Sequence, residues 1–387
     1  MSGAKGQVIN MDFTITKDQQ NLANEIIDFS RQNLNEPQFL EEYSPLMFKK
    51  LADFGLLGIT VGEEYGGLGE SYLTAAIAFE ALGYSCKNNG FIFVVNNHIW
   101  VAQNIIYLYG SKALANKYVP SMVQGEKIGA VAITEADAGS DALRMTTSAI
   151  PTEGGYILNG SKMFISNGPI ADIFVVFAVT ESDPIKKLTA FVVEKSFEGV
   201  KSSGDIDKMG LGACPTSEII FSNCFVPGEN LLGRLNMGGS LLTYVLEWER
   251  LYEFAPHIGV MQRVMEQCEE QARMRKQFGR SISEYQAVSH KIADMKVAIE
   301  MSKLMMYKAA CMKDEDRSAF SEVSMFKLFV SENYIKTCRD ALQIFGGYGY
   351  TKEYDVEREL RDALASSIYS GTNEMQRNTI FNMLSAN

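Results

Sequence analysis

The chain has 387 residues, of which 46% are hydrophobic and 21% are charged, and its formal net charge is −11 at pH 7. This composition is that of an ordinary folded protein with two or three packed units, because single hydrophobic cores stop growing at roughly 250 to 300 residues. The acidic balance argues against nucleic acid and anionic membranes as partners, since both attract an excess of Lys and Arg.

Cysteine usage and the N-terminal region bear on the compartment. The cysteines are scattered and form no CxxC pair, which fits a reducing environment better than a disulfide framework. We find no signal-peptide pattern and no run of 18 apolar residues, so we expect a soluble, cytoplasmic protein. Residues 1–10 lack periodicity and precede Met11, which indicates an extension of the folded unit or a cloning remnant.

Helical patterns dominate the first third of the chain. Thr16 begins a capping box, and apolar residues then recur at helical spacing, which predicts a helix from about Lys17 to Leu34. A second helix is predicted to follow Pro45 and to stop at Gly55. Further helices are predicted over residues 71–82, 96–108 and 112–123.

The periodicity changes near Gly129. Short runs of β-branched and aromatic residues follow, over residues 130–134, 156–159, 173–179 and 188–193. Because no long helix separates these runs, we predict a mostly antiparallel sandwich or barrel spanning about 130–235. Helical periodicity returns after Gly239 through segments 241–274, 284–312 and 319–345, so the predicted fold class is α+β, with helices, then strands, then helices.

Two loops of the strand region carry groups suited to holding a planar ring. Ala132–Asp141 ends a strand and supplies backbone amides, hydroxyls and a glycine. Phe164 and Ser166 stand two residues apart and hence on the same side of a regular strand, where an aromatic side chain can stack on a ring and a hydroxyl can reach its edge. Alone, the first loop is equally explained by an ordinary polar turn, and the second segment is better explained by a plain hydrophobic strand that ends in an Asn-Gly turn.

A third loop, Gln343–Tyr350, is rich in glycine and follows a long predicted helix. Its glycines allow backbone amides to approach a phosphate or an adenine closely. The loop lacks the preceding strand and the glycine spacing of a dinucleotide-binding fold, so a Rossmann interpretation is disfavoured, and a glycine-rich helix end is the alternative.

Taken together, these segments resemble the acyl-CoA dehydrogenase superfamily from about Met11 to the end of the chain. Ala132–Asp141 is similar to one family signature, apart from Arg144 in place of a small residue, and Gln343–Asp362 matches another. The resemblance implies the acyl-CoA dehydrogenase fold, with an N-terminal α-helical domain, a central antiparallel β domain and a C-terminal four-helix bundle. The expected boundaries are 11–129, 130–236 and 237–387.

The resemblance also implies non-covalent FAD in a homotetramer, and it assigns contacts. For the flavin ring these are Ile133, Thr134, Phe164 and Ser166; for the FAD of a neighbouring subunit, Arg275, Phe278, Gln343, Gly346 and Gly347; and near the C-terminus, Thr372 and Glu374. Ser140 resembles the residue at the mouth of the substrate channel.

The family's usual catalytic base is missing. The family's reaction removes an α proton from an acyl thioester while the β hydrogen leaves as a hydride to flavin N5, and this weakly acidic proton requires a positioned carboxylate. Most members resemble Tyr-Glu-Gly-Thr where this chain has Tyr369-Ser370-Gly371-Thr372. A serine hydroxyl cannot serve as that base unaided.

A replacement base is predicted on the helix that begins near Ser240. When each residue is advanced by about 100°, Glu249 falls inside the apolar arc, whereas Glu247 and Arg250 fall on the opposite or lateral side. Desolvation on an apolar face raises the pKa of a carboxylate, a state suited to a general base. No cation stands three or four residues away, so the alternative role for Glu249 is an ion pair with a remote Arg.

The surrounding residues narrow the resemblance. A minority of the superfamily, including isovaleryl-type enzymes, carries its base on this helix in a Glu-Arg context. Trp248-Glu249-Arg250 combined with Ser370-Gly371-Thr372-Asn373 most resembles dehydrogenases of secondary metabolism that oxidise L-prolyl groups on carrier proteins. The implied substrate contacts are Ser140, Trp248, Arg250, Tyr369 and Ser370, although core packing is the common role of a tryptophan.

The sequence therefore predicts an FAD-dependent acyl-thioester dehydrogenase with Glu249 as its base. Its expected partners are an acyl or peptidyl carrier protein and an electron acceptor, either a flavoprotein or oxygen. The dispersed histidines indicate no metal site. Three alternatives stay open: a short- or branched-chain acyl-CoA dehydrogenase, a flavin monooxygenase or oxidase on the same fold, and a non-catalytic acyl-binding relative.

Overall fold

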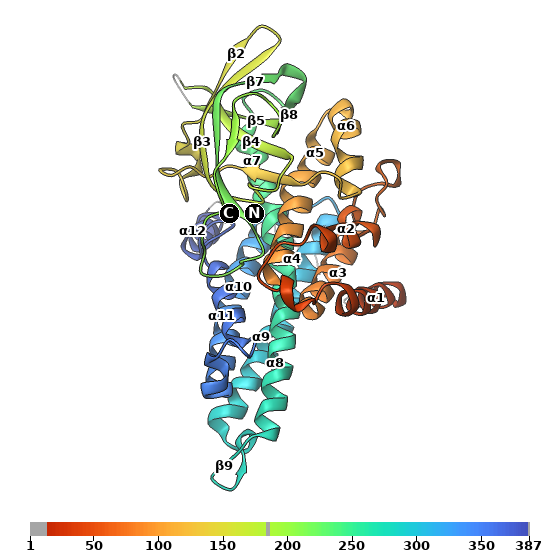
Figure 1. Ribbon diagram of the computed structural model, residues 1–387, viewed down its shortest axis with the longest axis vertical. Coiled ribbons are helices and arrows are strands. Elements are labelled where there is room, and N and C mark those ends of the chain that lie inside the picture. The colour runs from red at the N-terminus through yellow and green to blue at the C-terminus, as the bar shows by residue number, and fades with distance from the viewer. Residues whose placement is uncertain (1–13, 183–185, 386–387) are drawn as a thin grey trace, which may run out of the picture.

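The computed structural model describes residues 14–182 and 186–385, so the expected extension over residues 1–10 lies outside the described residues. Figure 1 shows a β sheet at one end of a set of long helices, with the N-terminal helices packed against the side of both. Helices precede the strands and follow them again, which confirms the predicted α+β class.

The N-terminal helices begin and end largely where their caps predict. In α1 (Lys17–Asn33), Thr16 Oγ1 accepts from Gln19 N at 3.2 Å and Gln19 Oε1 accepts from Thr16 N at 3.0 Å, which is the capping box. α2 (Pro45–Asp53) ends before Gly55, whose φ of +93° favours glycine. The other helices are α3 (Tyr72–Ser85), α4 (Asn89–His98), α5 (Asn104–Tyr109) and α6 (Lys112–Val123).

The helix predicted over residues 96–108 begins earlier, at Asn89, and the π-helical turn Ile99–Gln103 joins α4 to α5. The pattern missed this start because the segment is buried on nearly every side and has no polar face to mark its period. By length and composition the run Asn89–Tyr109 could cross a membrane, but 83% of its most apolar window is buried inside the protein. It therefore serves as a core helix.

The sheet is mixed rather than purely antiparallel. Its strands are β1 (Gly129–Ala132), β2 (Ser148–Thr152), β3 (Gly155–Ser166), β4 (Ile173–Glu181), β5 (Lys187–Glu194), β6 (Val200–Ser202), β7 (Thr216–Pro227) and β8 (Leu231–Leu232). They are ordered β6-β7-β3-β2-β4-β5-β8, and β1 pairs with β4. Most pairs are antiparallel, as predicted, but β1 runs parallel to β4, and one parallel bridge joins β2 to β4. No hairpin connects β1 to β4, so no turn sets their relative direction.

The C-terminal region consists of α7 (Gly238–Tyr252), α8 (Ala255–Met274), α9 (Gln286–Asp314), α10 (Phe320–Phe345), α11 (Val356–Ala365) and α12 (Asn373–Ser385). The segment predicted over 241–274 is two helices, because Pro256 starts a new helix in the first turn of α8. Helices α8, α9 and α10 run alongside one another, and the short hairpin of β9 (Lys276–Gln277) and β10 (Arg280–Ser281) closes their far end (Figure 1). α7 contacts β5, α10 and the π-helical turn, so it lies where the three parts of the protein meet.

Candidate active site

α7 carries Glu249 into this junction. The Glu249 side chain is half-buried, between the buried residues Trp248 and Arg250. Burial raises the pKa of Glu249, whereas the nearby hydroxyl of Ser370 and the charges of Arg250 and Lys327 act in the opposite direction. The raised pKa is the state expected for a general base. Within the described residues Glu249 forms no ion pair with a remote Arg, the alternative role for this carboxylate.

The two sequence features predicted to act together are in contact. Arg250 Nε donates to the carbonyl of Ser370 at 3.2 Å, and Gln376 Nε2 donates to the carbonyls of Ser370 and Gly371 at 3.2 and 2.9 Å. Ser370 has a φ of +59°, which is strained for a residue with a side chain. Its buried Oγ has no hydrogen-bond partner of good geometry among the described residues, yet lies near enough to Glu249 to lower the carboxyl pKa. Arg250 therefore holds this loop against α7, and Gln376 holds it against α12.

The charges beside Glu249 are more deeply buried than the helical pattern indicated. Glu247 and Arg250 were expected away from the apolar arc, but they are only 2% and 4% exposed. Glu247 Oε1 accepts from Lys313 Nζ and from Ala319 N, both at 2.8 Å, and Arg250 Nη1 donates to Ser324 Oγ at 3.2 Å. The pattern failed because α7 is enclosed by protein around most of its circumference, and a buried charge is tolerated where it is paired.

Trp248 packs in the core rather than beside an open site. It is 5% exposed, its ring centroid lies 4.5 Å from that of Tyr72, and Lys313 Nζ lies 4.0 Å from the ring. Core packing, the common role of a tryptophan, accounts for these contacts. Tyr369 is half-buried, and its hydroxyl lies 2.6 Å from Nε2 of the buried His257.

Ile133 and Thr134 directly follow β1, in a loop that Glu135 and Lys162 fix by hydrogen bonds. Glu135 accepts from Thr146 N at 2.6 Å and from Lys162 Nζ at 2.9 Å, and Lys162 Nζ also donates to the carbonyl of Ile133 at 3.0 Å. Although burial opposes it, hydrogen bonds from Thr147, Thr146 and Lys162 lower the pKa of Glu135 to about 2. Ile133 and Thr134, next to the buried Glu135–Lys162 ion pair, are partly exposed. Ser140, farther along the loop, is exposed.

The Phe164 side chain is exposed at a point where the backbone of β3 is irregular. It has a φ of +58° and is 60% exposed, and the register between β3 and β7 shifts between Lys162 and Ile165. The shift interrupts the alternation of the strand, so the expectation that Phe164 and Ser166 share a side has no regular strand to rest on. An exposed aromatic ring on a strained backbone fits a wall for a planar ligand. This observation fits the flavin ring.

The residues expected to reach a neighbouring subunit's cofactor lie in or next to the β9–β10 hairpin and at the end of α10, and this hairpin closes the end of the long helices opposite the sheet (Figure 1). Phe278 is 95% exposed with a φ of +51°, and Arg275 Cζ lies 5.6 Å from the ring of Tyr348. Gln343, Gly346 and Gly347 are exposed, and open space surrounds the α-carbons of the two glycines. One chain therefore does not bring this group together with Ile133 and Phe164.

The C-terminal pair lies at the start of α12. Thr372 Oγ1 accepts from Met375 N at 3.3 Å and so caps the helix, while Glu374 is exposed in its first turn. The intervening Asn373 is buried and accepts from Lys327 Nζ at 2.7 Å. Burial, followed by the charge of Arg250, lowers the pKa of Lys327 to about 7.

Two buried titratable groups beside Glu249 were not predicted as site residues. No local signal points to Lys327, because it comes from α10 and reaches the site only through folding. Glu253 follows Glu249 by one helical turn, so the helical spacing could have revealed it.

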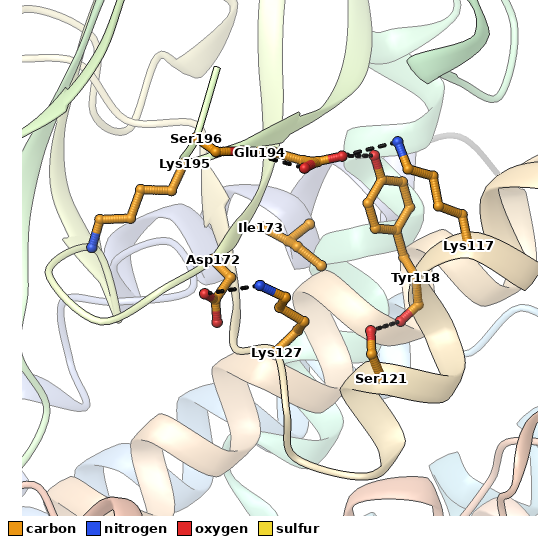
Figure 2. Close-up of a pocket in the computed structure, with 9 residues that line it drawn as sticks. All are labelled: Lys117, Tyr118, Ser121, Lys127, Asp172, Ile173, Glu194, Lys195 and Ser196. Carbon is orange, nitrogen blue, oxygen red and sulfur yellow. Dashed lines mark hydrogen bonds and ion pairs between the residues drawn. The ribbon is translucent and has the colours of Figure 1, made fainter. Parts of the chain in front are cut away.

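A surface pocket of about 450 Å³ between α6 and the sheet contains none of the predicted site residues (Figure 2). Its charges pair with one another: Glu194 Oε1 lies 2.9 Å from Lys117 Nζ and 2.8 Å from Tyr118 Oη, and Asp172 Oδ1 lies 3.5 Å from Lys127 Nζ. Because its charged groups pair with one another and it contains none of the predicted site residues, we do not assign this pocket to the candidate site.

Comparison with known proteins matches the chain to three family models. They are described as the acyl-CoA dehydrogenase N-terminal domain over residues 16–126, the middle domain over 130–224 and the C-terminal domain over 236–384. An L-prolyl-[peptidyl-carrier protein] dehydrogenase from Serratia sp. is 36% identical, covering 96% of this chain and 97% of the relative. An acyl-CoA dehydrogenase from Bacillus subtilis is 37% identical, covering 94% and 97%.

A solved structure described as PigA with FAD and proline superposes with a TM-score of 0.94. It is 35% identical, and the match covers 97% of this chain and 99% of that chain. Proteins named for carrier-bound and for CoA-bound substrates are thus equally similar in sequence. Overall identity does not separate the two substrate classes.

Proposed function

We propose that this chain oxidises an L-prolyl group held as a thioester on a carrier protein. The chain belongs to the acyl-CoA dehydrogenase family and is an FAD-dependent oxidoreductase. The observation that carries the proposal is the contact between the helix bearing Glu249 and the loop bearing Ser370. Relatives named for carrier-bound prolyl groups, and one structure described with FAD and proline, support this substrate class.

In this proposal Glu249 removes the α proton of the acyl thioester. Burial raises the pKa of Glu249, which favours its binding of that proton, and Arg250 Nε donates to the carbonyl of Ser370 at 3.2 Å, which keeps the Ser370 loop against α7. Bound FAD supplies the acceptor for the hydride at flavin N5. Ile133, Thr134, Phe164 and Ser166 would hold the flavin ring, and Thr372 and Glu374 would hold the cofactor near the C-terminal helix.

We also propose a homotetramer in the cytoplasm that passes electrons to a flavoprotein or to oxygen. An assembly of several chains is supported by the separation of the two groups of cofactor residues: the β9–β10 hairpin and the end of α10 carry one group and lie at the end of the long helices away from the sheet that carries Phe164 (Figure 1). Sedimentation velocity of the holoenzyme tests this assembly, and a stable monomer that retains FAD would contradict it.

The Glu249→Gln variant tests the assignment of the base. Mixing anaerobic holoenzyme with L-prolyl carrier protein should bleach the flavin of the unaltered protein, and the variant should do so about 10²- to 10⁴-fold more slowly with its FAD retained. Glu247→Gln is the matched control, because it neutralises another carboxylate of α7 that is paired with Lys313. Bleaching by Glu249→Gln at the unaltered rate would overturn the assignment.

The substrate class needs a separate test. L-Prolyl carrier protein, free L-proline, butyryl-CoA and isovaleryl-CoA can be compared by flavin bleaching and mass spectrometry of the products. Loss of two or four hydrogens from the carrier-bound prolyl group is the expected result. Oxidation of the acyl-CoAs alone would establish the short- or branched-chain alternative, and incorporation of oxygen into the product would establish a monooxygenase.

A further inference from the structure

A second buried carboxyl group, Glu253, lies one helical turn beyond Glu249. Its backbone N–H donates to the carbonyl of Glu249 at 2.8 Å, so the two side chains leave successive turns of one helical segment. Glu253 is 2% exposed, and neither carboxyl oxygen has a hydrogen-bond partner of good geometry among the described residues. Burying such a group unpaired is costly.

Glu253 differs in this respect from the other buried acidic side chains of the described chain. Each of the others has a cation or an amide as partner: Glu135 with Lys162, Glu247 with Lys313, Asp340 with Lys291, Glu359 with Arg263, and Asp362 with the N–H of Leu211. Structural carboxylates of this protein are thus paired within the fold. The exception stands next to the predicted base.

Other unpaired polar groups surround the same place. The Asn96 side chain of α4 lies near enough to Glu253 to act against the rise of its pKa, but neither Asn96 Oδ1 nor Nδ2 makes a hydrogen bond of good geometry in the described part of the chain. After burial, the charges of Glu253 and Glu249 are the main influences that raise the pKa of Tyr369, which places both carboxyls near that side chain. Ser370 Oγ completes the set. Buried polar groups left unpaired together indicate a polar ligand or water.

We propose that Glu253 binds the protonated secondary amine of the substrate's acyl group while Glu249 faces its α-carbon. This inference rests on the proposed function. In a prolyl thioester the ring nitrogen is bonded to the α-carbon, and successive helical turns are about 5.4 Å apart, so carboxyls one turn apart can reach an atom and its substituent. An ammonium supplies the cation that Glu253 lacks.

The same arrangement selects against hydrocarbon acyl groups. A butyryl or isovaleryl group has no charge at this position, and its binding would supply neither a cation nor a hydrogen bond to Glu253 and Asn96. In the absence of a cation, burial and then the charge of Glu249 raise the pKa of Glu253 well above its usual range, which favours the protonated carboxyl. When the ammonium binds, the carboxyl releases one proton to solvent and the ion pair forms.

Two thioesters on one carrier protein test the inference. L-Prolyl and cyclopentanecarbonyl groups share a five-membered ring and differ by an NH₂⁺ in place of a CH₂. The unaltered holoenzyme should favour the prolyl thioester in kcat/KM for flavin reduction. Glu253→Gln should lower that value for the prolyl thioester by about 10- to 100-fold, and leave it unchanged or higher for the cyclopentanecarbonyl thioester.

Rates are expressed per bound FAD, so partial unfolding of a variant does not alter the ratio between the two substrates. Glu253→Asp keeps the carboxyl and should retain the prolyl preference, and Glu247→Gln serves as the control on the same helix. Equal losses on both thioesters, or no loss on either, would overturn the role of Glu253. Oxidation of acyl-CoAs alone by the unaltered enzyme would instead overturn the proposed function, and this inference with it.

Discussion

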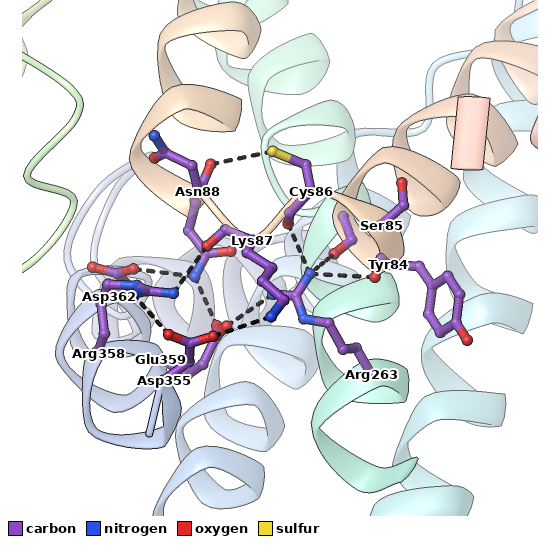
Figure 3. A network of polar contacts seen from close by, with 12 residues as sticks. Tyr84, Ser85, Cys86, Lys87, Asn88, Arg263, Asp355, Arg358, Glu359 and Asp362 are labelled. Carbon is purple, nitrogen blue, oxygen red and sulfur yellow. Dashed lines mark hydrogen bonds and ion pairs between the residues drawn. The ribbon is translucent and has the colours of Figure 1, made fainter. Parts of the chain in front are cut away.

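Two buried polar clusters join the N-terminal helices to the C-terminal region, and they differ in how completely they are paired. The first, here called the Arg263 network, comprises Arg263, Glu359 and Asp362, which Figure 3 labels, and Asn89, which donates to both carboxylates. The second, the Glu249 cluster, comprises Glu249, Glu253, Asn96 and Ser370. Nearly every hydrogen-bonding atom of the first cluster has a partner, whereas several atoms of the second have no partner of good geometry within residues 14–182 and 186–385.

The Arg263 network connects four separate segments through short contacts. Arg263 Nη2 donates to Glu359 at 2.8 Å, and its Nη1 donates to the carbonyls of Gly83 and Cys86 at 2.8 and 2.7 Å. Asn89 Nδ2 donates to Glu359 and Asp362 at 2.7 and 3.1 Å, and Leu211 N donates to Asp362 at 2.6 Å. This network stabilises the fold.

The contrast teaches how to separate structural charges from functional ones in this protein. A buried charge that supports only the fold has its partner within the chain, because an unpaired one would destabilise the folded state. A buried charge that serves a ligand leaves its partner position open. The predictions below test that distinction, beginning with the largest expected effect.

Removing the central cation of the Arg263 network should produce the largest loss of stability. Arg263→Met leaves Glu359 buried without its cation, and we expect the free energy of unfolding to fall by about 3 to 5 kcal/mol in denaturant titrations of the holoenzyme. Arg273→Met is the control, because its pair with Glu269 is exposed and should contribute less than about 1 kcal/mol. Equal losses of unfolding free energy in both variants would contradict a structural role for the network.

Asp362 should make stability depend on pH. Burial, with the charge of Glu359, raises the pKa of Asp362 to about 6, so the folded state keeps a proton that the unfolded state has already released. Stability should therefore fall as the pH rises from about 4 to about 6, by about 2 to 3 kcal/mol. Asp362→Asn should flatten the unfolding free energy in that window. An unchanged pH profile in the variant would show that Asp362 is not the titrating group.

Glu253 should behave in the opposite way to Arg263. Glu253→Leu removes a buried carboxyl that has no cation as partner, so we expect the free energy of unfolding to stay unchanged or to rise by about 1 kcal/mol. Thermal unfolding of the holoenzyme measures this change. A loss comparable to that of Arg263→Met would mean that Glu253 supports the fold, and the difference between the two clusters would disappear.

Ser370 should have the smallest effect. Its hydroxyl lowers the pKa of Glu249 against burial, so Ser370→Ala should raise that pKa and move the acidic limb of the flavin-reduction profile upward by about half a pH unit. FAD content should not change. A shift toward lower pH would contradict the position of the hydroxyl beside Glu249.

Much of the local structure could be predicted from the sequence. The capping box at Thr16, the helix end at Gly55 and the long helices α9 and α10 follow from residues close together in the chain. Helical spacing singled out Glu249. Ser370 stood out because it occupies the position of Glu in the family's Tyr-Glu-Gly-Thr motif. The sheet was less predictable, because the parallel pairing of β1 with β4 depends on segments that no turn connects.

The sequence by itself determined the order of helices and strands, the family resemblance and the prediction that Glu249 replaces the base missing at Ser370. Only the tertiary structure decided that Arg250 bonds to the carbonyl of Ser370 at 3.2 Å, that Glu247 is buried against Lys313, and that Glu253 has no partner of good geometry among the described residues. The physical reason is the distance along the chain over which each interaction acts. Helix periods and caps act over a few residues, whereas the pairing of buried charges is settled only when distant segments pack together.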